Sequence, residues 1–233
     1  MLLRHLHLPG TTPYAHASDI QQRLVSALLA YKANPVGTRP PPTIITAEFR
    51  PVYTCGRREV GNVSAEQIAH LTAKTPHGRA EFHEALRGGQ TTFHGPGQLV
   101  AYPILDLKQH GLGARDYVCL LEKSVIQLLR DKYSIESKTT DNPGVWVDDD
   151  RKICALGVHL RRNVSSHGIG LNVSTELAWF DRIVACGLEG KRTTSMRDMG
   201  VLEPDVEVIA EQYVGIVANR LSGVEKTERI QDI

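Results

Sequence analysis

Four short segments of the sequence contain residue types that could do chemistry. The first, residues 87–98, holds four glycines and one proline, so its backbone can turn tightly and approach a ligand closely. Within it, Arg87 could pair with an anion, and His94 could donate a hydrogen bond or act as a base. The alternative is a hairpin whose glycines serve only its turns. The pattern matches neither a Walker loop nor a dinucleotide-binding fingerprint, so it does not indicate a nucleotide site.

The other three segments place a reactive or flexible residue beside a strand or an apolar run. Residues 151–157 carry Lys152, which on this segment alone reads as a solvated hairpin lysine. Residues 167–172 carry two glycines, which also suit a bulged or closely packed strand. Cys186 follows the apolar run 179–184, where a thiol can be exposed, although most such cysteines are inert core residues. Taken singly, none of these segments establishes a function.

A chain that alternates helical and strand patterns must position these segments. Apolar residues recur at helical spacing in residues 14–32, 118–129 and 209–221. A capping box of Ser64 with Gln67 predicts the start of a shorter helix. Strands are predicted for residues 2–8, 43–54, 91–94, 99–105, 145–147, 153–160 and 169–173. Hairpins mixed with helices favour one α+β (mixed α/β) domain over residues 1–233, with residues 225–233 as a polar tail.

Composition narrows the class of protein. The 27 basic and 26 acidic side chains nearly cancel, which argues against a broad nucleic-acid-binding face. The longest stretch without Asp, Glu, Lys or Arg contains Gln, His and several glycines, so no membrane span is predicted. The 4 cysteines lie more than thirty residues apart, which predicts neither a disulfide framework nor a structural zinc site. No metal site is expected.

In their order and spacing, the motifs resemble the lipoyl(octanoyl) transferase family. The resemblance rests on Arg-Gly-Gly-Gln-Thr-Thr-Phe-His-Gly-Pro-Gly-Gln at 87–98, on Gly-Val-Trp-Val at 144–147, and on residues 152–157, 167–172 and 186–188. It covers nearly the whole chain, to about Arg197. Residues 47–51 read Ala-Glu-Phe-Arg-Pro in place of the His-Pro-Pro usual in bacterial members. The chain is therefore more similar to the eukaryotic, mitochondrial branch.

The resemblance implies a fold, a reaction and a set of partners. The fold would be that of lipoate and biotin protein ligases, with a mixed sheet and a smaller sheet flanked by helices. An octanoyl group would move from octanoyl-acyl carrier protein to a specific lysine of a lipoyl domain, the first step of endogenous lipoate biosynthesis. The acceptors would be lipoyl domains of 2-oxoacid dehydrogenase complexes and the glycine cleavage H protein. Because the donor is already a thioester, no ATP or other cofactor is implied. The location would be the mitochondrial matrix, or the cytoplasm for a bacterial chain.

The resemblance also assigns roles to individual residues. Cys186 matches the acyl-accepting nucleophile and Lys152 its partner lysine. An ammonium group within ~4–6 Å lowers the pKa of a thiol by roughly one to three units, which is enough to make the thiolate abundant at neutral pH. Lys152, once neutral, could take the proton of the attacking acceptor lysine. The residues that match the acyl pocket are Arg87, Gly88, Gly89, Gln90, Thr91, Thr92, Phe93, His94, Ala155, Leu156, Gly157, Gly168, Ile169 and Gly170.

Several alternatives stay open at this point. Cys154 is a second thiol close to Lys152 and competes for the nucleophile's role. A lipoate–protein ligase would use ATP and need no cysteine, and an amidotransferase between lipoyl domains would use a different donor. A carrier-binding module would hold acyl chains without a covalent intermediate. Three basic doublets, at residues 57–58, 161–162 and 191–192, are candidates for docking acidic partners or are ordinary solvated turns.

Overall fold

The structure, a computed structural model, describes residues 1–183 and 190–232. Its largest part is an 8-stranded mixed sheet that contains, in spatial order, β10 (Arg192–Thr193), β8 (Arg151–Arg161), β9 (Val164–Asn172), β6 (Gln98–Ile104), β2 (Thr43–Phe49), β1 (Leu2–Thr12) and β11 (Lys226–Ile230), with β7 (Val145–Trp146) paired to β8. β1 runs parallel to β2 and β11, whereas β6 is antiparallel to β2 and β9, and β8 is antiparallel to β9. A 3-stranded sheet contains β4 (Glu81–Glu84), β3 (Val52–Cys55) and β5 (Thr92–His94), in that order.

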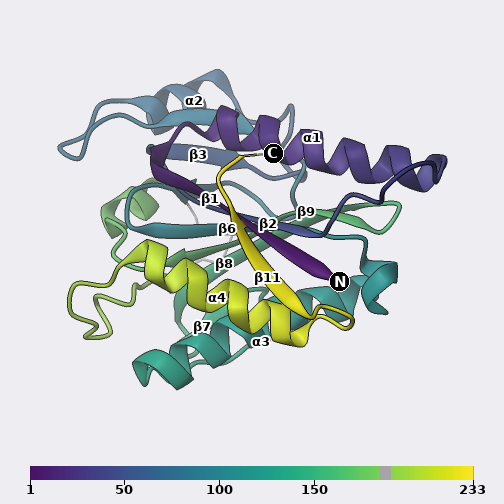
Figure 1. The fold of residues 1–233 in the computed structure, drawn as a ribbon. Helices are drawn as coiled ribbons and strands as arrows, with labels where there is room; N and C mark the ends of the chain where they lie inside the picture. Colours follow the sequence, from purple (N-terminus) through teal and green to yellow (C-terminus); the bar gives the residue numbers. More distant parts are fainter. Residues whose placement is uncertain (184–189, 233) are drawn as a thin grey trace.

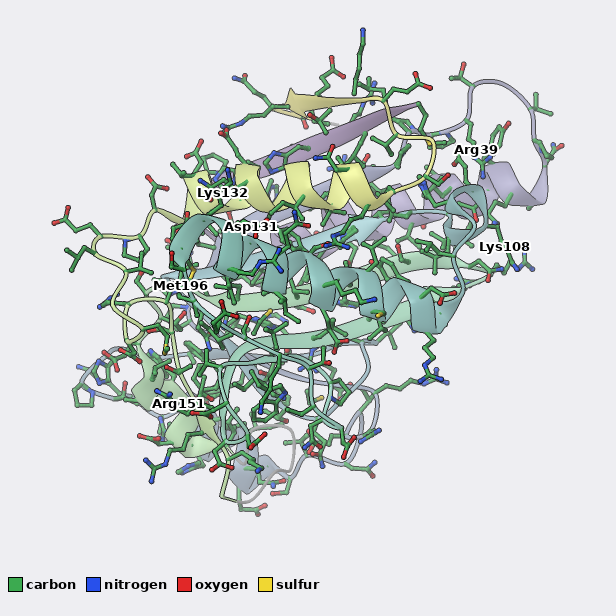
Figure 2. The ribbon with its side chains drawn as sticks, turned by 90° about the horizontal axis from the view of Figure 1, so that it is seen from below. Arg39, Lys108, Asp131, Lys132, Arg151 and Met196 are labelled. Carbon is green, nitrogen blue, oxygen red and sulfur yellow. The ribbon has the colours of Figure 1, made fainter. Side chains whose placement is uncertain are left out.

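Helices cover both faces of the large sheet (Figure 1). α1 (Tyr14–Ala33) packs on one face, and α3 (Ala114–Tyr133) and α4 (Val206–Arg220) pack together on the other. Figure 2 views the molecule from the side of α3 and α4, with Lys132 in the last turn of α3. Leu121, Val125 and Leu128 recur at helical spacing on α3 and are completely buried. Burial of each such side chain stabilises the fold by ~1.5–3 kcal/mol.

The small sheet has a core of its own. α2 (Ala65–Thr72) begins at Ser64, and the predicted capping box with Gln67 is confirmed by hydrogen bonds in both directions. The 3-10 helix η2 (Leu177–Arg182) brings Trp179 against Phe93, with stacked rings 5.0 Å apart. The Tyr53 hydroxyl donates to the Trp179 carbonyl at 2.6 Å. A second 3-10 helix, η1 (Leu107–His110), follows β6.

Two predictions from the sequence are wrong about which strands pair with one another. Residues 43–54 form β2 and β3, which belong to different sheets and are separated at residues 50–51. The strands on either side of Gly95 are not a hairpin, because β5 pairs with β3 in the small sheet and β6 pairs with β2 and β9 in the large one. The glycine segment therefore links the two sheets.

The expected polar tail is also wrong for most of its length. Lys226–Ile230 form β11, which pairs in parallel with β1 from Leu2 to Leu6 at the edge of the large sheet. Its side chains are mostly exposed, which explains why the sequence of this segment lacks the apolar pattern of a strand. In the described part of the chain, no helix has the length and apolar character needed to cross a membrane.

Candidate active site

Three segments far apart in the sequence meet at one cavity. It is narrow, about 30 Å³, which is room for one or two water molecules. Tyr102 on β6 also lines it. The residues that the sequence predicted for the acyl pocket and that line this cavity are Arg87, Gly88, Gly89, Thr92, His94, Ala155, Leu156, Gly157, Gly168, Ile169 and Gly170. The structure therefore brings most of the predicted set together.

The glycines of these segments permit close backbone approach. A Cβ atom at Gly157 would lie 2.8 Å from the Gly88 carbonyl oxygen, and one at Gly168 would lie 2.2 Å from the Ala101 carbonyl oxygen. Real Cβ atoms do not come this close to backbone oxygens, so β8 can contact the glycine segment, and β9 can contact β6, only without these side chains. At Gly168 this close approach agrees with the alternative that residues 167–172 are a closely packed strand.

Arg87 shapes the loop around this cavity. Its side chain is 7% exposed, and its Nη2 donates to the Thr54 carbonyl at 2.6 Å. Its Nη1 donates to the carbonyls of Gly88 and Gln90 at 3.0 and 2.9 Å. These hydrogen bonds direct the guanidinium to backbone oxygens of its own loop and of β3. The buried guanidinium thereby fixes the path of residues 88–90, and the pairing of Arg87 with an anion stays a prediction.

His94 lies at the start of a buried chain of polar side chains. Its Nδ1 bonds to the Gln98 Oε1 at 2.6 Å, and the Gln98 Nε2 donates to the Asn172 Oδ1 at 2.8 Å. The Asn172 Nδ2 donates to the Thr194 carbonyl at 3.0 Å, and the Thr194 amide donates to the Lys152 carbonyl at 2.9 Å. This direction of donation makes the His94 Nδ1 a donor. Burial and then the charge of Arg87 lower the pKa of His94 to about 4, so the ring is neutral near pH 7 while its Nδ1 donates to Gln98.

Lys152 lies at an irregularity of β8. Trp146 pairs with Lys152 whereas Val145 pairs with Cys154, so Ile153 is an extra residue on β8, a β-bulge. The ammonium group lies 4.6 Å from the centre of the Trp146 ring, and the side chain is only 7% exposed. The structure thus contradicts the simple alternative of a solvated hairpin lysine.

A second cavity contains Lys152. It measures about 380 Å³, within the range of small-molecule sites. It shares Gly88, Gly89, Leu156 and Gly157 with the narrow cavity. Its other lining residues are Arg58, Gln90, Val118, Asn142, Pro143, Lys152 and Val158. The predicted acyl-pocket segments and the predicted catalytic lysine are therefore neighbours.

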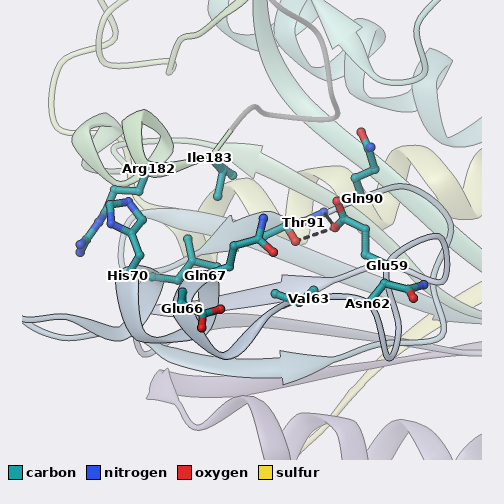
Figure 3. Close-up of a pocket in the computed structure, with 11 residues that line it drawn as sticks. Glu59, Asn62, Val63, Glu66, Gln67, His70, Gln90, Thr91, Arg182 and Ile183 are labelled. Carbon is teal, nitrogen blue, oxygen red and sulfur yellow. Dashed lines mark hydrogen bonds between the residues drawn. The ribbon is translucent and has the colours of Figure 1, made fainter.

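Two predicted pocket residues face elsewhere. Phe93 points into the core of the small sheet, where it stacks on Trp179. Thr91 donates through its amide and its hydroxyl to the Glu59 carboxylate, at 2.5 and 2.6 Å (Figure 3). Both Thr91 and Gln90 line a third, more open cavity of about 610 Å³ between α2 and η2.

Of the two candidate thiols, the structure describes Cys154 but not Cys186. Cys154 is 1% exposed in the main core, and burial raises its pKa well above its ordinary value. A thiol in this state is a poor nucleophile. Cys186 lies outside the described residues. Thr193, seven residues after it, pairs with Lys152 through β10, so the described chain on that side returns to the lysine. No group of three or more metal-ligating side chains occurs in residues 1–183 and 190–232.

Sequence reasoning missed several residues of the site. Gln98 and Asn172 end two of the quoted motifs, and their polar character in strands that are otherwise apolar is a signal that could have found them. Tyr102 and Val118 line the cavities but carry no such signal, because both also suit an ordinary core.

Comparison with known proteins decides the family. Residues 13–216 match the model described as lipoyl protein ligase A/B catalytic domain. The chain belongs to this family. A probable octanoyltransferase of Schizosaccharomyces pombe is 50% identical over 188 residues, which are 81% of this chain and 82% of that protein. The human protein named octanoyl-[acyl-carrier-protein]:protein N-octanoyltransferase LIPT2, mitochondrial, is 41% identical over 191 residues, 80% of each chain.

Solved structures of the family share the fold. A bi-partite lipoate protein ligase, described with its E2 lipoyl domain from Thermoplasma acidophilum, superposes with a TM-score of 0.66 over 99% of this chain and 85% of that one, at 13% identity. A lipoate-protein ligase A bound with ATP superposes with a TM-score of 0.68 over 100% of this chain and 89% of that one, at 12% identity. The predicted ligase-like fold and the predicted resemblance to octanoyltransferases are both confirmed.

Proposed function

We infer that this chain is an octanoyltransferase of lipoate biosynthesis, which moves an octanoyl group from octanoyl-acyl carrier protein to a lysine of a protein. The observation that carries this conclusion is 41–50% identity over four fifths of the chain to proteins with that name or activity. The names of several relatives also place them in mitochondria, and the mitochondrial matrix is the corresponding location for this chain.

In the proposed mechanism, Cys186 and Lys152 carry the two acyl transfers. The Cys186 thiolate attacks the carbonyl carbon of the donor thioester, and the carbon–sulfur bond to the carrier breaks. The carrier thiolate leaves and takes a proton from the Lys152 ammonium group, which thereby becomes neutral. The acceptor amine then attacks the new thioester, gives a proton to Lys152, and releases the Cys186 sulfur. Burial of Lys152 beside the 380 Å³ cavity and burial of Cys154 in the core support this assignment.

The acyl chain is proposed to lie along the predicted pocket residues, with its carbonyl near Lys152. The narrow cavity holds only about 30 Å³, so eight carbons do not fit in it alone. The larger cavity shares four glycine-segment and β8 residues with it and supplies the remaining room. Gly88 and Gly89 line both cavities. Because the Gly88 amide already donates to the Val158 carbonyl, the Gly89 amide is the candidate donor to the oxyanion.

The acceptors are proposed to be lipoyl domains of 2-oxoacid dehydrogenase complexes and the glycine cleavage H protein. A family member described with an E2 lipoyl domain supports the class of acceptor. No cofactor enters this mechanism, because the donor thioester already carries the activation of the acyl group.

A donor-choice assay tests the proposal. The purified chain is given an apo lipoyl domain with either octanoyl-loaded carrier or free octanoate plus ATP, and octanoylation of the domain is followed by mass. We expect product only from the carrier, with loss of product in Cys186→Ser. Product from octanoate and ATP that persists in Cys186→Ser would instead assign the chain to the ATP-dependent ligases, whose fold it shares.

A further inference from the structure

The three basic doublets of the sequence differ in whether their charges are paired with a carboxylate. Lys191 is paired with Asp150 at 2.8 Å, so its charge is partly neutralised within the fold. The doublets at residues 57–58 and 161–162 are exposed, and within residues 1–183 and 190–232 none of their four arginines has a carboxylate within ion-pair distance. These four guanidinium groups are exposed positive charge in a chain whose net charge is only +1.

Backbone contacts hold these two doublets on the same side of the site. The Arg57 amide donates to the Arg87 carbonyl at 2.8 Å, and the Gly88 amide donates to the Val158 carbonyl at 3.0 Å. The loop that carries residues 57–58 is thereby fixed to the end of β8. His159 lies between the two doublets: burial lowers its pKa first, and the charges of Arg57 and Arg161 lower it further. We call Arg57, Arg58, Arg161 and Arg162 the arginine surface.

The arginine surface adjoins the cavity that contains Lys152. Arg58 and Val158 line one part of this cavity and Lys152 another. At ~3.3 Å per residue, Val158 lies roughly 20 Å along β8 from Lys152, and Arg161 lies roughly 30 Å from it. A partner bound to the arginine surface must therefore reach its reaction point through a long extension.

The β8–β9 turn keeps an arginine at a strained position. Arg162 has φ 49° and the next residue, Asn163, has φ 64°, both in the left-handed region. Asn tolerates this conformation, whereas a long side chain without a local hydrogen bond adopts it at a cost of about 1 kcal/mol or more. Gly or Asn would suit the turn better than arginine. An exposed arginine that destabilises the turn in which it lies indicates that its charge serves a function other than stability.

We propose that the arginine surface docks the acidic acyl carrier protein that supplies the octanoyl group, and that the carrier's prosthetic arm passes along the cavity toward Lys152. This proposal rests on the proposed function. Acyl carriers and lipoyl domains are both acidic, but only the carrier presents its acyl group on a long arm. A lysine side chain is five bonds long and spans on the order of 6 Å, far less than the roughly 30 Å along β8 between Arg161 and Lys152. The reach that is needed therefore favours the carrier's arm over the lysine of an acceptor domain.

The test compares two donors on one variant. In Arg161→Glu with Arg162→Glu, neither changed residue lines any of the three cavities described above, and both are exposed. The donors are octanoyl-loaded carrier and S-octanoyl-pantetheine, which has an arm but no protein and no charge. The control, Arg23→Glu with Lys132→Glu, makes the same change of charge on α1 and in the last turn of α3. A further variant, Arg162→Asn, removes one charge and suits the turn.

We expect the double variant to raise KM for the loaded carrier about tenfold at low salt, with kcat and the pantetheine reaction within about twofold of wild type. The difference should shrink toward 1 M salt, where the Debye length is only ~3 Å. Arg162→Asn should raise the carrier KM while raising the melting temperature. Three results would overturn the proposal. The double variant could lose activity equally with both donors, the control variant could raise KM for the carrier as much as the double variant does, or the KM that rises could be that for the acceptor domain. Wild type that transfers octanoyl from neither donor would refute the proposed function itself.

Discussion

The buried polar chain from His94 to Lys152 predicts that Gln98 and Asn172 are energetically coupled. Asn172→Leu keeps the side-chain size but removes the shorter hydrogen bond of the Gln98 Nε2, which keeps only its 3.3 Å bond to the Phe93 carbonyl, and it leaves the Thr194 carbonyl without a partner. Gln98 and Thr194 are both 3% exposed or less. A buried group left unpaired costs about 1–3 kcal/mol and a lost hydrogen bond about 0.5–1.5 kcal/mol, so the variant should lose about 2–4 kcal/mol of unfolding free energy. For a chain of this size that corresponds to a fall in melting temperature of roughly 5–15 °C.

The assay is a double-mutant cycle read by urea unfolding. Gln98→Leu should also destabilise the fold, because it frees the Asn172 Oδ1 and the His94 Nδ1. The double variant removes both partners of the central hydrogen bond, so its loss should fall short of the sum of the single losses by about 1–3 kcal/mol. Each variant should also react more slowly with S-octanoyl-pantetheine, because the series of buried hydrogen bonds ends at the carbonyl of Lys152. Losses that add within about 0.5 kcal/mol would refute the coupling.

Three further predictions follow from single residues. Lys152→Met should fold, reduce octanoyl transfer by about 10²–10⁴-fold, and move the iodoacetamide-labelling profile of Cys186 to higher pH; an unchanged profile would mean that Lys152 does not activate the thiol. Phe93→Ala should destabilise the small sheet by about 3–5 kcal/mol without changing chain-length preference, measured with hexanoyl, octanoyl and decanoyl donors, whereas a shifted preference would return Phe93 to the pocket. His94 has its pKa lowered from 6.5 to about 4, so the stability it contributes is complete above pH 6.5 and is lost as pH falls toward 4, about 3 kcal/mol in all. His94→Gln should flatten the dependence of unfolding free energy on pH between 7 and 4, and an equally steep curve would contradict the assignment.

The helices and most of the site could be predicted because their signals are local. The apolar spacing of residues 14–32 and the capping box at Ser64 give the positions of α1 and α2. The two glycines of residues 167–172 indicated room beside a strand, and the structure shows that Gly168 lies against the Ala101 carbonyl.

What the sequence could not supply is long-range pairing. Nothing local in residues 43–54 shows that β2 and β3 enter different sheets, because both halves are equally apolar and buried. β11 pairs with β1 across more than 220 residues, and its exposed polar side chains hide a strand that is held by backbone hydrogen bonds. A sequence likewise does not show that the carbonyls of Thr54, Gly88 and Gln90 accept hydrogen bonds from Arg87.

Intact mass spectrometry after incubation with octanoyl-loaded carrier, in the absence of acceptor, tests the central claim most directly. The chain should gain the mass of one octanoyl group, and peptide mapping should place it on Cys186. Cys154→Ala, which changes a thiol buried in the core, should keep the adduct, and Cys186→Ser should lose the thioester. An adduct on Cys154, or octanoyl transfer to the lipoyl domain at the wild-type rate by Cys186→Ser, would contradict the mechanism.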